Sequence, residues 1–133
     1  MKRLDADTVF SIFESGYERE EDTLDPFSHP YILMGLIIAG VSTFETIARN
    51  YQDLYPDQFK KIHKKVKLLY YDRLYGFLQN IDPSLPLHLL ECTKHDLGKI
   101  ILTLTILLKE YESQEEYTRC AKIKRLLDEI VAF

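Results

Sequence analysis

The sequence predicts an all-α fold, an irregular single-domain helical bundle of four main helices plus two short ones. The strongest evidence is residues 96–112, where apolar side chains recur at three- and four-residue intervals, the spacing of one face of an α-helix. No useful length of the chain alternates apolar and polar residues as a strand does, and no internal repeat is found. A helical interior is therefore expected.

Composition indicates one domain. The 133 residues are 46% apolar, and five Gly and five Pro are too few for a linker or a low-complexity tail. A chain of this length buries roughly two thirds of its unfolded surface in a single core. We therefore predict one domain over residues 1–133, with a short helix and an acidic loop in residues 1–30 and the bundle in residues 31–133.

The cellular location is predicted from the cysteines and from the lack of long apolar runs. Cys92 and Cys120 fall in different predicted helices, and no charged leader with an apolar core follows Met1. The longest weakly polar run, residues 31–43, has thirteen residues, fewer than the roughly 20 that cross a bilayer. We expect a soluble cytoplasmic protein with free thiols and no membrane contact.

The N-terminal part is expected to hold a short helix over residues 6–15. Asp5 can cap the free backbone N–H groups of this helix, and Gly16 is a natural end. The acidic residues that follow have little to bury and precede Pro26, which cannot donate a backbone hydrogen bond. Residues 17–25 are therefore expected to form a loop.

The first long helix is expected over residues 31–51. It is apolar nearly all round at its start, and Gly35, Ala39 and Gly40 leave room for another helix to approach. We expect a tight helix crossing at these small residues.

The second long helix is expected over residues 57–81, capped by Asp57 after Pro56. Lysines occupy one side of it, and its apolar side chains are expected to lie in the core. These apolar residues are Phe59, Ile62, Val66, Leu69, Tyr70, Leu74, Phe77 and Leu78.

A turn and a short helix over residues 85–92 follow. Thr93 and Asp96 have the spacing of a capping box, which predicts that the next helix starts near Lys94. Since few charged residues interrupt that helix, over residues 96–112, it is expected to be covered on most sides and to form the axis of the bundle.

The last helix is expected from residue 113 or 114 to residue 131, with apolar side chains along one side. It would close the bundle, whose interior is expected to hold the helices at 31–51 and 96–112.

Charge is unevenly distributed along the chain. The net charge is −4, but residues 1–30 carry three basic and eight acidic side chains, whereas residues 57–75 carry six basic and two acidic ones. The lysine face is therefore expected to meet an acidic surface, either of another protein or of the chain's own loop at residues 18–25. The predicted partner-binding residues are Lys60, Lys61, Lys64, Lys65, Lys67, Tyr71, Tyr75, Glu18, Glu20 and Glu21.

The same lysines allow a second hypothesis, a nucleic-acid-associated accessory protein. Lysines at several helical phases can straddle a phosphate backbone, and Tyr71 and Tyr75 can stack on bases. The acidic net charge argues against this hypothesis. A third reading assigns the lysines only the role of keeping a solvated face soluble.

Four residues in one segment are competent metal ligands, and they would support a metal-dependent helical-bundle enzyme. The residues are His88, Glu91, Cys92 and His95, which one unbroken helix would bring to one side. Against this reading, the predicted cap at Thr93 interrupts the helix, and the Glu-x-x-His pattern of di-iron bundles is absent. We therefore expect no metal, no cofactor and no catalytic residue.

Residues 115–127 read Glu-Glu-Tyr-Thr-Arg-Cys-Ala-Lys-Ile-Lys-Arg-Leu-Leu. Together with the residues around them, about 108–131, they resemble the UVR motif of bacterial excision-repair proteins, a helical hairpin. The residues that match its aromatic, small and aliphatic positions are Tyr117, Cys120, Ala121 and Ile123. Lys124 stands where the motif usually has Arg, and Arg125 stands where it usually has Asp. The resemblance implies protein contacts through pairing with another such hairpin, and not catalysis.

These observations together predict a non-catalytic protein–protein interaction module, a small adaptor or an assembly or regulatory factor. Its partner is expected to be another protein, and a second copy of the chain, giving a homodimer, is one alternative. The expected contact surface combines the lysine face, the acidic loop and the outer face of the last helix.

Overall fold

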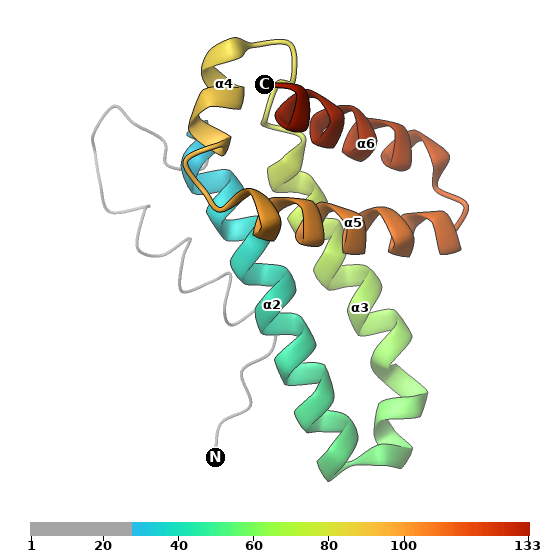
Figure 1. Ribbon diagram of the computed structural model, residues 1–133. Helices are drawn as coiled ribbons and strands as arrows, with labels where there is room; N and C mark the ends of the chain where they lie inside the picture. Colours follow the sequence, from blue (N-terminus) through green and yellow to red (C-terminus); the bar gives the residue numbers. More distant parts are fainter. Residues whose placement is uncertain (1–27) are drawn as a thin grey trace, which may run out of the picture.

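The computed structural model describes residues 28–133, which form five helices and, within that range, no strand. The helices are α2 (Pro30–Leu54), α3 (Pro56–Leu78), α4 (Pro86–Cys92), α5 (Leu97–Ser113) and α6 (Tyr117–Ala132) (Figure 1). The predicted all-α class is confirmed. The expected short helix at residues 6–15 and the acidic loop at residues 17–25 lie outside the described residues.

α2 and α3 form a long antiparallel hairpin with a one-residue connection. Tyr55 is the only residue between the two helices, and Pro56 supplies a backbone angle that suits the first position of α3. The Tyr55 N–H donates to the Tyr51 carbonyl oxygen at 2.8 Å, and the Phe59 N–H donates to the Tyr55 carbonyl oxygen at 2.9 Å. The chain therefore reverses without an exposed loop.

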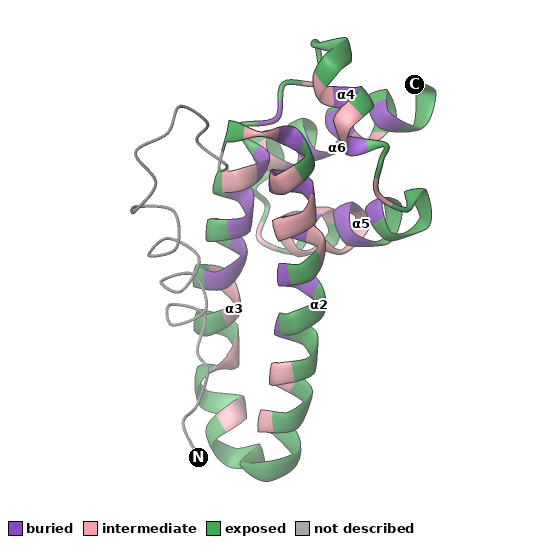
Figure 2. Ribbon diagram, turned by 90° about the vertical axis from the view of Figure 1, so that its left-hand side faces the viewer, coloured by how far each residue is buried: buried purple, intermediate pink, exposed green. Residues whose placement is uncertain are grey.

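A second hairpin, made of α5 and α6, lies across one half of the α2–α3 hairpin, and α4 lies at the same end of the molecule (Figure 1). The other half of the α2–α3 hairpin projects beyond this contact (Figure 2). No residue from 45 to 69 is buried, whereas Phe44 before this segment and Tyr70 after it are. We call residues 45–69 the arm.

The core lies where the two hairpins meet. α5 contributes four side chains without exposed area and α2 contributes three, while α3, α4 and α6 add one each. The residues without any exposed area are Leu33, Met34, Ile37, Leu74, Cys92, Ile100, Leu104, Leu107, Tyr111 and Ile123.

α2 is also the one helix in the described range that is long and apolar enough, by length and composition, to cross a membrane. Its most apolar window has a mean hydropathy of 1.7, and 28% of that window is buried inside the structure. Here its apolar residues form the centre of the bundle, as Leu33, Met34 and Ile37 illustrate.

α5 is less enclosed than the sequence predicts. Its side toward α2 and α6 is buried, but Leu97, Ile101 and Leu102 are 47%, 38% and 62% exposed. The expectation of an axial helix is therefore wrong for α5, because this helix lies on the outside of the α2–α3 hairpin and only one side is covered.

α5 also starts later than predicted. Asp96 is the N-cap, and its Oδ2 accepts a hydrogen bond from the Lys99 N–H at 2.9 Å. Thr93 does not cap α5: it is the C-cap residue of α4, and its hydroxyl donates to the Leu90 carbonyl oxygen at 2.7 Å. The expected capping box is therefore replaced by a single aspartate cap three residues later.

Candidate interaction surface

The tip of the arm is stiffened by a group of aromatic rings. The Tyr51 ring lies 5.5 Å from the Tyr55 ring and 6.5 Å from the Phe59 ring, measured between centroids. His63 stacks on Phe59 at 4.6 Å, and its Nδ1 lies 2.9 Å from the Phe59 carbonyl oxygen. The Tyr51 hydroxyl donates to Gln58 Oε1 at 3.0 Å. These contacts hold the two helix ends together without a hydrophobic core around them.

An apolar row runs along the arm on α3. Ile62, Val66 and Leu69 are 44%, 41% and 60% exposed, although the sequence predicts that they are buried. That prediction is wrong because the apolar residues of α3 extend further around the helix than the part of its surface that other helices cover. On a helix with about 3.6 residues per turn, residues spaced by four and three lie on one side, so the three side chains form a continuous strip.

Lysines border this apolar row. Lys61 and Lys65 each precede a row residue by one position and therefore lie about 100° away from it around the helix. Lys60 and Lys64 each precede a row residue by two positions and therefore lie about 200° away from it around the helix. All four side chains are exposed. The arm thus presents an apolar strip with a positively charged margin.

Lys67 does not belong to this margin. Its Nζ lies 2.9 Å from Glu110 Oε2 on α5 and 5.7 Å from the centroid of the Tyr71 ring. Both the ion pair and the ring contact point toward the core. Lys67 therefore fastens α3 to α5, and its charge is neutralised within the molecule.

Tyr71 and Tyr75, predicted as a stacking surface, lie in the core. They are 1% and 3% exposed, so neither ring can stack on a base or on a partner. Burial raises the pKa of Tyr71, and the charges of Glu45 and Glu110 raise it further. The prediction failed because both residues fall on the side of α3 that the second hairpin covers.

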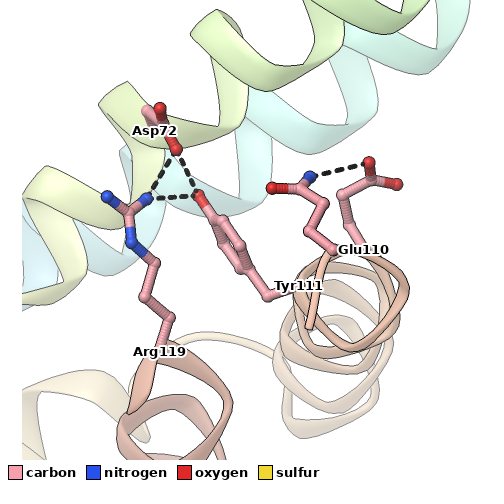
Figure 3. Close-up of polar contacts among 5 residues, drawn as sticks. Asp72, Glu110, Tyr111 and Arg119 are labelled. Carbon is pink, nitrogen blue, oxygen red and sulfur yellow. Dashed lines mark hydrogen bonds and ion pairs between the residues drawn. The ribbon is translucent and has the colours of Figure 1, made fainter. Parts of the chain in front are cut away.

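A polar network connects the two hairpins (Figure 3). Arg119 Nη1 on α6 donates to Asp72 Oδ1 on α3 at 2.5 Å and to the Tyr111 hydroxyl oxygen at 3.2 Å. The Tyr111 hydroxyl donates in turn to Asp72 Oδ1 at 3.1 Å. The Arg119 guanidinium also lies 4.6 Å from the centroid of the Tyr75 ring. The network joins α6 and α5 to α3. It could not be predicted from the sequence, because these three residues are far apart along the chain and no regular spacing relates them.

The four residues considered as metal ligands, which the sequence was not expected to use for a metal, do not converge. His88 Nδ1 accepts a hydrogen bond from the Asp82 N–H at 2.9 Å, and Glu91 pairs with Lys94. Since α4 ends at Cys92, His95 leaves the helix, and its ring stacks on Tyr31 with centroids 4.3 Å apart. Within residues 28–133, no group of three His, Cys, Asp or Glu side chains is arranged to hold a metal ion.

The two cysteines are buried, and burial disfavours their thiolate forms. Cys92 has no exposed area, and burial, with a smaller effect from the charge of Glu91, raises its pKa to about 12. Burial also raises the pKa of Cys120. Both thiols are therefore protonated near neutral pH, whereas a nucleophile requires the thiolate.

The acidic residues predicted to join the contact surface, Glu18, Glu20 and Glu21, lie outside the described residues. The C-terminal residues that carry the resemblance lie in α5 and α6. Cys120 and Ile123 face the core, whereas Tyr117 is 67% exposed.

Comparisons with known proteins do not extend this description. No family model, curated protein or solved structure matches the chain. The resemblance of the C-terminal hairpin to the UVR motif therefore stays a prediction.

Proposed function

We propose that the protein is a non-catalytic protein–protein interaction module, a small cytoplasmic adaptor or assembly or regulatory factor. The observation that carries the proposal is the apolar row of Ile62, Val66 and Leu69, exposed on an arm that projects from the core. Contiguous exposed apolar surface bordered by polar residues is typical of protein interfaces.

The chemistry of the arm favours an acidic partner. Apolar side chains at the centre of an interface supply most of the binding energy, whereas charged residues at its margin guide association and select the partner. Lys61 and Lys65 occupy such a margin. The matching surface would carry apolar side chains flanked by Asp or Glu.

The test is affinity capture with the wild-type protein and three variants, followed by reconstitution with the purified partner. An Ile62→Ser/Leu69→Ser variant removes the apolar row, and a Lys61→Glu/Lys65→Glu variant reverses its charged margin. Leu102→Ser is the control, because Leu102 on α5 is 62% exposed and Leu69 on the arm is 60% exposed. We expect the first variant to abolish binding, the second to weaken it in a salt-dependent way, and the control to bind as the wild type does.

The proposal is overturned if all four proteins behave alike in capture and reconstitution. A monomeric protein that retains nothing would have the same consequence. Sedimentation equilibrium of the wild type and of the Ile62→Ser/Leu69→Ser variant tests the homodimer, because only the wild type should then self-associate.

A second candidate function is binding to nucleic acid. It is supported by four exposed lysines, Lys60, Lys61, Lys64 and Lys65, within two turns of one helix. With Tyr71 and Tyr75 buried, such binding would depend on phosphate contacts alone. Titration with DNA and RNA should then give affinity that falls steeply with salt, and no binding at low salt would exclude this function.

The outer face of α6 is a further candidate for protein contact. The support is the exposure of Tyr117 together with the resemblance to the UVR motif, whose hairpins pair with one another. Tyr117→Ser should weaken self-association if this face is used, and should leave the arm-dependent binding unchanged.

A further inference from the structure

We propose that residues 5–25 of this chain bind the apolar row of α3 within the same molecule. This goes beyond the interaction proposed above, because it concerns a contact inside one chain and requires no external partner. Charge, the pattern of apolar residues and the length of the connecting chain all favour this contact.

Charge complementarity is the first step. Residues 1–30 carry eight acidic and three basic side chains, and seven of the eight acidic residues lie between positions 7 and 25. The row on α3 is bordered by the exposed Lys61 and Lys65. The acidic residues at positions 7–25 and the lysines beside the row are therefore complementary in charge.

The apolar pattern is the second step. The sequence predicts a helix over residues 6–15, and in such a helix Val9, Phe10, Ile12 and Phe13 would share one side. A helix of that length is about 15 Å long, and the row from Ile62 to Leu69 is about 10 Å long, at about 1.5 Å per residue. The row therefore accommodates the apolar side of such a helix, and each surface would cover apolar side chains that are otherwise left in water.

The connecting chain is long enough. In the hairpin, Ile62 and Leu69 lie beside α2 about 27 Å and about 17 Å from its first residue, at about 1.5 Å per residue. Residues 16–27 would bridge this distance, because twelve extended residues span about 40 Å. A short tether of this kind gives an effective concentration on the order of millimolar, so weak docking suffices to occupy the row.

Hydrogen exchange of the full-length protein, measured by mass spectrometry or NMR, tests the proposal. An isolated helix of ten residues is marginal in water, so undocked residues 6–15 should exchange as an unstructured peptide does. We expect exchange at least about tenfold slower than that in the wild type. The protection should be lost in Ile62→Ser/Leu69→Ser, reduced in Lys61→Glu/Lys65→Glu, and kept in the Leu102→Ser control.

Three results would overturn the proposal. The first is free-peptide exchange of residues 6–15 in the wild type. The second is protection that persists in Ile62→Ser/Leu69→Ser while the amides of α5 and α6 verify that this variant is folded. The third is protection that rises with protein concentration, which would assign the row to a second copy of the chain. None of these results depends on an external partner, so this inference and the proposed function can fail separately.

Discussion

Gly40 on α2 lies directly against Leu74 on α3. A Cβ atom built on Gly40 would stand 2.5 Å from Leu74 Cδ2, closer than real side chains approach one another. Both residues are buried. The sequence predicts a tight helix crossing at the small residues of α2. At Gly40, α2 and α3 pack closely against each other, as that prediction requires.

This contact predicts opposite effects of the same substitution at two helical glycines. Gly40→Ala should lower the free energy of unfolding by about 1 kcal/mol, because overpacking outweighs the gain in helix propensity. Gly76→Ala on α3 has nothing within 4 Å of the added atom and should raise it by about 0.5–1 kcal/mol. Urea unfolding measures both, and a Gly40→Ala variant more stable than the wild type would contradict the argument.

The pair formed by Arg119 and Asp72 should show a measurable coupling. The side chains are 33% and 47% exposed, so a double-mutant cycle with Arg119→Ala and Asp72→Ala should give about 0.5–1 kcal/mol. Because the pair reaches solvent, the coupling should shrink between about 0.05 M and about 1 M salt. Additive effects at low salt would show that the ion pair does not hold α6 on α3.

Arg119→Lys provides the matched control for geometry in this network. Lysine keeps the positive charge but loses the planar group that stacks over Tyr75 and Tyr111. We expect it to recover only part of the stability lost in Arg119→Ala. Full recovery would mean that charge alone is important.

The turn between α5 and α6 stores strain at Glu115. This residue has φ of 59°, and the Glu116 N–H donates to the Tyr111 carbonyl oxygen at 2.9 Å, as in a helix end that normally uses glycine. Glu115→Gly should therefore raise the free energy of unfolding, by about 0.5–1 kcal/mol. Glu112→Gly, inside α5, should lower it by a similar amount and serves as the control for a general effect of glycine.

Replacing a leucine of α3 by alanine should destabilise the protein much more in the core than in the arm. Leu74 has no exposed area, so Leu74→Ala should cost about 2–5 kcal/mol. Leu69 is 60% exposed within residues 28–133, so Leu69→Ala should cost far less, about 0.5–1 kcal/mol with residues 5–25 docked on the row as inferred above. A loss as large as that of Leu74→Ala would contradict this distinction between the arm and the core.

Stability should fall at alkaline pH because buried acids remain protonated in the folded state. The Cys92 thiol has its pKa raised from 9.0 to about 12, and burial raises the pKa of Tyr70, Tyr71 and Tyr111 as well. For Cys92, the unfolded chain releases its proton first, so its contribution is complete below pH 9.0 and is lost as the pH rises toward about 12.

Thermal unfolding between about pH 8 and about pH 11 measures this decline, and Cys92→Ala should show a smaller decline than the wild type. The same loss of stability in both proteins would assign the effect to the tyrosines and Cys120. A stability that rises with pH over this range would contradict the sign of all four shifts.

The sequence alone determined the helical class and the approximate positions of the helices, because the period of apolar residues in a helix is local information. It also located the small residues around Gly40, where backbones approach closely. The capping box expected from Thr93 and Asp96 did not form, because Thr93 belongs to the end of α4 and Asp96 alone caps α5.

The tertiary structure decided which apolar residues are covered. Ile62, Val66 and Leu69 are apolar as Tyr70 and Leu74 are, but they lie on a side of α3 that no described helix covers, in the arm that projects beyond the second hairpin (Figure 2). The network of Asp72, Tyr111 and Arg119 likewise joins residues that no local pattern relates. Which residues are buried depends on how one hairpin lies on the other. Contacts between segments far apart in the sequence determine that arrangement, and the spacing of apolar residues within a single helix does not.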